Sequence, residues 1–127
     1  MADYQRKFSV GSRLKSFIHA FSGLRSLLFH EHNARIHLAA TIIAVALGIF
    51  LHISLVEWSV LVGIIALVFV VEILNSAIER LADHVSPRIN PVIKMVKDYG
   101  AAAVLIAGIA AVVIGIILFL PKLLNFL

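Results

Sequence analysis

The residues that decide the fold are 58–83, which read WSVLVGIIALVFVVEILNSAIERLAD. The uncharged part ends before Glu72 and is too short to cross a bilayer, because a hydrocarbon core of about 30 Å needs roughly 20 helical residues. No proline or glycine occurs between residues 64 and 86, so a helix can continue past this carboxylate. The sequence therefore predicts one long membrane-spanning helix, over about residues 57–84, with an acidic side chain inside its apolar part.

The whole chain is too apolar for a soluble domain. It has 127 residues, of which 61% are hydrophobic and 14% are charged, and its mean hydropathy is +1.04. Soluble domains are only about 45–50% apolar, and small ones leave a large fraction of their surface exposed to water. Lipid must therefore surround much of the chain, which predicts a single all-α integral membrane domain over residues 1–127.

Two other runs without Lys, Arg, Asp or Glu flank this helix, at residues 36–56 and 99–121. Pro87 and Pro91 disfavour a continuous helix between the second and third runs, so a loop is expected at about residues 85–92. We therefore predict three transmembrane helices, at about residues 36–54, 57–84 and 95–119.

Basic residues are distributed unequally between the ends of these spans. The loop between the first and second spans has no Lys or Arg, and only Lys122 follows the third. The other basic residues precede the first span (Arg6, Lys7, Arg13, Lys15, Arg25, Arg35) or lie around the second loop (Arg80, Arg88, Lys94, Lys97). Because cytoplasmic segments carry an excess of Lys and Arg, the N-terminus and the second loop are predicted to be cytoplasmic and the C-terminus to lie outside.

The composition also excludes some kinds of site. The chain has no cysteine, which excludes disulfides and thiolate metal sites. A net charge of +4 could indicate a nucleic-acid partner. In so apolar a chain, the basic excess is better explained by membrane orientation, and no nucleic acid is expected.

Before the first span, residues 12–30 have the apolar periodicity of a helix. The apolar positions are Leu14, Phe17, Ile18, Phe21, Leu24 and Leu28. Basic and polar residues occupy much of the other face, which predicts an amphipathic helix on the cytoplasmic membrane surface. The same pattern is equally consistent with a helix that packs on the bundle, and the two arrangements are compatible.

The second span carries a polar stripe. Glu72, Asn75, Glu79 and Asp83 follow the spacing i, i+3, i+7, i+11, which places them on one helix face. A carboxylate at the depth of Glu72 costs a few kcal/mol and indicates a functional site. Two alternatives are an intersubunit hydrogen bond and a protonated glutamate that is merely tolerated.

Phosphoryl transfer is a chemistry that needs such a stripe. It requires divalent cations held by carboxylates and basic side chains that face phosphate. Glu31, Lys94, Lys97 and Asp98 add these groups on the predicted cytoplasmic side, although the chain has neither a Walker motif nor the motifs of protein kinases. His30, His32, His37 and His84 lie nearby, but they lack a fixed ligand spacing and are better explained as surface residues than as a zinc site.

These residues also support a resemblance to a known family. The run Glu72-Ile-Leu-Asn-Ser-Ala-Ile-Glu79, followed by Asp83, resembles the hallmark of the prokaryotic diacylglycerol kinases, which are small three-span lipid kinases of the bacterial inner membrane. Supporting motifs are Glu31-His-Asn-Ala-Arg-Ile-His37, Lys97-Asp98 and Ala101-Ala-Ala-Val-Leu105. The resemblance covers about residues 12–122.

Several positions resemble the undecaprenol kinase branch of the family. These are Ser16-Phe-Ile-His-Ala20 with Gly23, the run from Glu31 to His37, Glu57-Trp58, Pro91 with Lys94, and Phe119-Leu-Pro-Lys122. The resemblance implies an ATP-dependent kinase that converts undecaprenol to undecaprenyl phosphate. The alternative acceptor is diacylglycerol, which would give phosphatidic acid.

The resemblance implies a role for individual residues. Glu72 matches the proposed general base, and Glu31 and Glu79 match carboxylates that hold Mg²⁺ on the ATP phosphates. Asp83 and Lys94 are supporting residues. The nucleotide site would include His19, Asn75, Lys97, Asp98 and Arg13, although the family's N-terminal basic residue aligns with Ser12, one place away from Arg13.

The resemblance further implies a homotrimer with sites shared between subunits. Three thin helices cannot enclose a site alone, and small residues at 101–103, Ala107 and Gly108 would permit close packing of the third span. Two readings from other classes stay open. One is a small proton or ion channel lined by Glu72 and Asp83, and the other is a membrane scaffold without activity.

Overall fold

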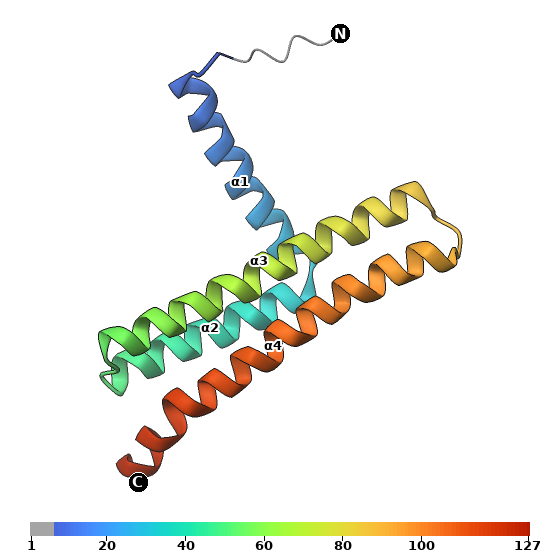
Figure 1. Cartoon of the computed structure of the whole chain (residues 1–127). Helices are drawn as coiled ribbons and strands as arrows, with labels where there is room; N and C mark the ends of the chain where they lie inside the picture. The colour runs from blue at the N-terminus through green and yellow to red at the C-terminus, as the bar shows by residue number, and fades with distance from the viewer. Residues whose placement is uncertain (1–6) are drawn as a thin grey trace.

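The computed structural model describes residues 7–127, and this part of the chain consists of four α-helices without strands. They are α1 (Val10–His30), α2 (His32–Phe50), α3 (Leu55–Val85) and α4 (Pro91–Phe126) (Figure 1). The last three are long and apolar enough to cross a membrane. The prediction of an all-α protein with three long, apolar helices is therefore confirmed. Arg6, one of the residues used for the orientation, lies outside the described part.

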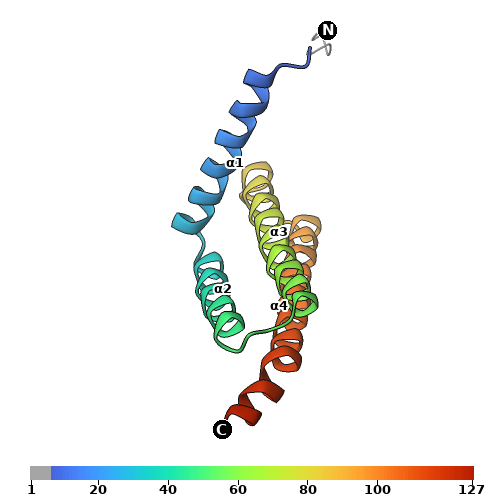
Figure 2. The same cartoon turned by 90° about the vertical axis from the view of Figure 1, so that its left-hand side faces the viewer.

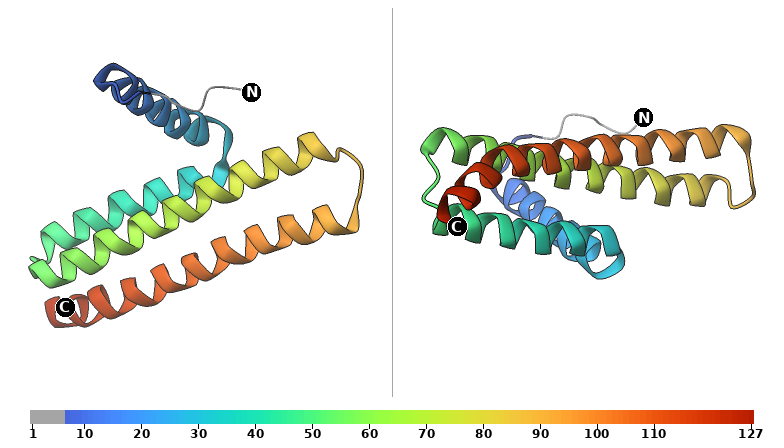
Figure 3. Two further views of the ribbon diagram at one scale, coloured as in Figure 1. Left: turned by 45° about the horizontal axis from the view of Figure 1, so that its top comes forward. Right: turned by 90° about the horizontal axis from the view of Figure 1, so that it is seen from below.

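The three long helices form an antiparallel bundle (Figures 1 and 3). α3 and α4 lie side by side over most of their length, while α2 accompanies only the first part of α3. A core cluster packs where the α2–α3 turn meets the end of α4, and it consists of Ile53, Leu61, Ile64, Leu118 and Phe119. The opposite end, toward the α3–α4 loop, contains the polar stripe of α3.

The helix ends differ from the predicted spans for identifiable reasons. α2 ends at Phe50, and His52 has φ = 50°, a left-handed backbone conformation that belongs to a turn. The predicted span of 36–54 includes this turn because it contains no Lys, Arg, Asp or Glu. A capping box then starts α3, because Glu57 N–H donates to Ser54 Oγ and Ser54 N–H donates to the Glu57 carboxylate, both at 3.2 Å. The α2–α3 turn therefore occupies residues 51–54, the last four residues of the predicted first span.

The loop before α4 is also shorter than predicted. α3 continues to Val85 and α4 begins at Pro91, so the connection comprises only residues 86–90. Asn90 caps the new helix with its side-chain oxygen, and proline is favourable in a first turn because no backbone N–H is needed there. At its other end α4 passes through Pro121 and reaches Phe126, beyond the predicted limit of 119.

α1 stands away from the bundle (Figures 1 and 2). Leu27 is its only buried residue, and the apolar side chains of Leu14, Phe17, Ile18 and Phe21 are exposed. Within this chain α1 therefore does not pack along the bundle as a core helix. Its exposed apolar residues need another environment, such as lipid or a second subunit.

A close contact joins α3 to α4 at Gly100, which is buried. A Cβ atom at this position would overlap the side-chain oxygen of Asn75 and lie 3.3 Å from its Cγ. Among the other small residues that were predicted to permit close packing of this span, residues 101–103 are exposed in the single chain, whereas Ala107 is buried. Gly100 is therefore the small residue that allows α4 to approach the polar stripe.

We predict that Gly100→Ala lowers stability, because the added methyl group must displace Asn75. Overpacking of this kind typically costs about 1–3 kcal/mol, which thermal unfolding of the purified protein in detergent can detect as a lower midpoint. Gly63→Ala is the control, because nothing lies within 4 Å of a Cβ at that position. Equal midpoints for both variants would show that Asn75 has room to move.

Candidate active site

Glu72 is the centre of the polar stripe. Its side chain is only 2% exposed, and its Oε2 has no hydrogen-bond partner within residues 7–127. His37 of α2 faces it, with Nε2 at 3.7 Å from Oε2. Because burying an incompletely paired carboxylate is costly, this residue is a strong candidate for a functional group.

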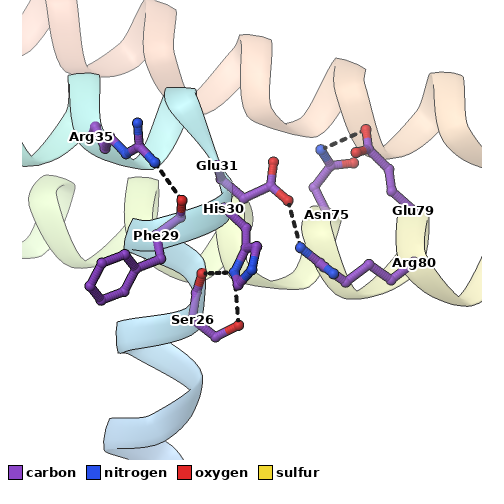
Figure 4. A network of polar contacts seen from close by, with 8 residues as sticks. All are labelled: Ser26, Phe29, His30, Glu31, Arg35, Asn75, Glu79 and Arg80. Carbon is purple, nitrogen blue, oxygen red and sulfur yellow. Dashed lines mark hydrogen bonds and ion pairs between the residues drawn. The ribbon is translucent and has the colours of Figure 1, made fainter.

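Asn75 and Glu79 continue the stripe toward the α3–α4 loop. The Asn75 side-chain amide donates to Glu79 Oε1 at 3.3 Å (Figure 4). The Asn75 Oδ1 atom is buried without a partner in the described part, next to Gly100. Glu79 is partly exposed, so one end of this pair is accessible to a ligand.

Glu31 reaches the same region from the α1–α2 junction. Its backbone is extended between the two helices, and its Oε1 lies 3.4 Å from the guanidinium of Arg80 on α3 (Figure 4). Arg35 fixes the junction, because its guanidinium donates to the carbonyl oxygens of Leu28, at 2.8 Å, and Phe29. The last turn of α1 is therefore held on α2, and Glu31 is directed toward α3.

Two ion pairs complete the polar end of the bundle. Lys97 of α4 pairs with Asp83 of α3, and Lys94 pairs with Asp98 at 2.6 Å within α4. The first pair brings a lysine to the end of the stripe. The second pair is more exposed and turns Asp98 toward Lys94, along the surface of α4.

Arg13 and His19 are not part of this cluster in the single chain. Both are exposed residues of α1, whose N-terminal part stands away from α2, α3 and α4 (Figure 2). The Arg13 guanidinium instead lies over the Phe8 ring, 5.5 Å from its centroid. The structure thus assembles Glu31, Glu72, Asn75, Glu79, Asp83 and Lys97 at one end of the bundle, but it does not bring Arg13 and His19 to them.

Three site residues were not recognised from the sequence. The sequence pattern indicates a surface histidine at His37 and only a cytoplasmic charge at Arg80, and it predicts no role for Gly100. One signal for His37 is available in the sequence. It is a polar residue in the first span, and the carboxylate buried in the second span requires a polar partner from a neighbouring helix. Arg80 and Gly100 could be assigned only once the relative positions of the helices were known.

The carboxylates fit Mg²⁺ that arrives with a nucleotide better than a permanent metal ion. Within residues 7–127 no cluster of three or more His, Asp or Glu side chains could hold a metal ion. Magnesium commonly binds proteins through one or two carboxylates and takes its other ligands from phosphates and water. Glu31 and Glu79 could supply two such carboxylates, provided that Glu31 leaves Arg80.

Comparison with known proteins assigns the chain to a family. The family model for prokaryotic diacylglycerol kinase matches residues 18–119. The chain belongs to this family. The membership supports the lipid kinase predicted from the sequence over a channel or an inactive scaffold.

Curated relatives agree with this assignment. An undecaprenol kinase of Bacillus subtilis is 35% identical over 109 residues, which cover 86% of this chain and 89% of the relative. A diacylglycerol kinase of Escherichia coli is 35% identical over 100 residues, covering 79% and 82%. A diacylglycerol kinase of Synechocystis is 35% identical over 113 residues, which cover 88% of this chain but only 65% of the relative. The chain is therefore a membrane lipid kinase.

The junction that presents Glu31 can be tested directly. Arg35→Ala removes both guanidinium contacts to the end of α1, so the amides of residues 27–31 should exchange faster with deuterated solvent. Hydrogen bonds to charged groups contribute about 1.5–3 kcal/mol, and exposure reduces this, so an increase of about tenfold is expected. Hydrogen exchange with mass spectrometry measures this rate. Lys15→Ala, which removes a basic side chain from α1 itself, is the control. Unchanged exchange in Arg35→Ala would show that Arg35 does not hold the junction.

Proposed function

We propose that this lipid kinase transfers the γ-phosphate of Mg-ATP to the hydroxyl group of undecaprenol and releases undecaprenyl phosphate. The observation that carries the proposal is the buried Glu72 carboxylate, whose neighbour His37 lines an apolar groove in a membrane-embedded bundle. The Bacillus subtilis relative, an undecaprenol kinase, supports this acceptor. The Escherichia coli relative, a diacylglycerol kinase, supports the alternative, in which the product is phosphatidic acid.

The groove lies between α2 and α4 on one face of α3 and has a volume of about 700 Å³. Aliphatic and small residues dominate its lining, including Ile64, Val68 and Gly108. Its polar lining residues, Asn33, His37 and Thr41, come from the first half of α2, and Phe119 lines the other end. An apolar chain with one terminal hydroxyl matches this polarity, with the hydroxyl beside His37 and Glu72.

In the proposed reaction Glu72 takes the hydroxyl proton while the acceptor oxygen forms a bond to the γ-phosphorus. The bond between that phosphorus and the bridging oxygen of ADP breaks, and ADP leaves with the electron pair. Bound Mg²⁺ would offset charge on the phosphates, held by Glu31 and Glu79. Lys97 adds positive charge from α4, and Asn75 orients Glu79 through its amide. Asp83 and Lys94 keep Lys97 and Asp98 in place through their ion pairs.

We further propose a homotrimer in which the nucleotide site is shared between subunits. The position of α1 supports this, because Arg13 and His19 stand away from their own stripe and could reach the stripe of a neighbour. The exposed apolar side chains of α1 support a location on the membrane surface, with Leu14 and Phe17 toward lipid.

The proposed location is the bacterial inner membrane, with the N-terminus inside and the C-terminus outside. The basic residues favour this orientation, and it places the α3–α4 loop and Glu31 in the cytoplasm, where ATP is available. Glu57 and Lys122, which pair at 3.3 Å, then lie at the outer end of the bundle.

Glu72→Gln should lower phosphate transfer by about 10²–10⁴-fold, the usual contribution of a general base. Binding of Mg-ATP should persist, because Glu72 is not among the groups proposed to hold the nucleotide. Transfer of labelled phosphate to lipid and equilibrium binding of a nucleotide analogue measure the two properties. A Glu72→Gln protein with near-normal turnover would refute the general base.

Glu79→Gln should raise the Mg²⁺ concentration needed for half-maximal activity, because one proposed carboxylate ligand is lost. Glu57→Gln is the matched control, since it removes a carboxylate from the other end of the same helix. Titration of activity with Mg²⁺ at fixed ATP distinguishes them. An unchanged Mg²⁺ requirement in Glu79→Gln would remove Glu79 from the metal site.

The acceptor is tested by incubating the purified protein with labelled Mg-ATP and either undecaprenol or diacylglycerol, side by side. We expect label in undecaprenyl phosphate. Label only in phosphatidic acid would establish the alternative acceptor, and label in neither lipid would contradict both.

A further inference from the structure

The proposed function does not explain how Glu72 is held in one orientation. The residue is 2% exposed, and its Oε2 has no hydrogen-bond partner in the described part of the chain. Glu79, seven residues further along α3, already accepts a hydrogen bond from Asn75 and is another acidic side chain. A carboxylate on a flexible side chain with no fixed partner would rotate, and a general base works only when it is within reach of its proton.

His37 is placed to prevent this rotation. Its Nε2 faces Glu72 Oε2 across the α2–α3 contact at 3.7 Å. This distance is longer than an ordinary hydrogen bond, but catalytic hydrogen bonds are often long without a ligand and shorten in the complex. The imidazole is itself restrained, because the ring of Phe69 meets it edge-on with a centroid separation of 6.5 Å. Phe69 precedes Glu72 by one helical turn, so the same stretch of α3 fixes both the histidine and its target.

His37 also lines the apolar groove, and its side chain is 22% exposed. It therefore lies between the space suited to the acceptor chain and the buried carboxylate. We propose that His37 is a positioning residue, whose Nε2–H holds Glu72 Oε2 and leaves the other carboxylate oxygen to meet the acceptor hydroxyl. This inference rests on the proposed role of Glu72 as the general base.

The activity test compares His37→Ala with His37→Gln. The alanine variant should lose about 10–100-fold in kcat, the usual effect of removing a group that orients a catalytic residue. The KM values for ATP and lipid should change by less than about twofold, since the role is exerted through Glu72. Glutamine can donate from a nitrogen at a similar distance along the side chain, so His37→Gln should recover most of the lost rate. His84→Ala, which removes an exposed histidine at the end of α3, is the control.

Three outcomes would overturn the proposal. The first is a wild-type kcat in His37→Ala. The second is a glutamine variant as slow as the alanine variant, which would mean that a hydrogen-bond donor at position 37 does not determine the rate. The third is a higher KM for lipid with an unchanged kcat, which would make His37 a contact of the acceptor rather than a support for Glu72.

A second measurement does not depend on activity. His37→Ala is made in the wild-type protein and in Glu72→Leu, and the four proteins are compared by thermal unfolding. If the two side chains interact, loss of His37 leaves a buried carboxylate without its partner, so the midpoint should fall by about 3 °C or more in the wild-type background. The fall should be less than half as large in the Glu72→Leu background, and additive effects would mean that the pair is not coupled.

The two tests separate this inference from the proposed function. If the wild-type protein phosphorylates no lipid, the proposed function fails while the unfolding cycle still reports on the pair. If lipid is phosphorylated and Glu72→Gln is inactive, but His37→Ala is fully active and the cycle is additive, only the role of His37 fails.

Discussion

The structure depends on one constraint, which is that α3 carries a carboxylate through an apolar, membrane-embedded segment. Glu72 is almost fully buried, and an ionisable group in such a place requires neighbours that offset the free energy of burying it. α2 supplies His37, and α4 approaches the next polar residue, Asn75, through the missing side chain of Gly100. Both neighbouring helices are thus adapted to α3 at the level of its polar stripe, whereas the far end of the bundle is an ordinary apolar core.

The acidic residues of the described chain differ in whether an Arg or Lys side chain pairs with them. Glu31, Asp83 and Asp98 each have an Arg or Lys partner, and so does Glu57 at the other end of α3. Among the ion pairs of the described residues, neither Glu72 nor Glu79 has such a partner. A nearby cation stabilises the charged form of a carboxylate and so makes it a poorer base. In the proposed reaction the unpaired Glu72 would therefore accept the proton, and Glu31 would join the unpaired Glu79 on a divalent cation only after it leaves Arg80.

Much of this arrangement could be predicted from the sequence, because it depends on periodicity. The spacing of Glu72, Asn75 and Glu79 places them on one face of any helix, and hydropathy alone locates three spans. Contacts between helices have no such signature. The pairing of Glu31 with Arg80, 49 residues away, and the orientation of α1 both depend on how the helices meet. The position of His37 beside Glu72 has no sequence signature for the same reason, since it depends on how α2 meets α3.

The groove shows how one pattern can serve two purposes. Small residues on the third span were interpreted as allowing close helix contacts, and Gly100 does so. Gly108, two turns further along α4, has nothing within 4 Å of a Cβ and lines the groove instead. α4 thus packs tightly on α3 at the polar stripe and leaves space beside α2 further along. If a lipid chain fills that space, Gly100 keeps α4 close to the polar stripe that carries the proposed chemistry. The small residues further along α4, such as Gly108, then determine how much of the acceptor chain the groove can bind.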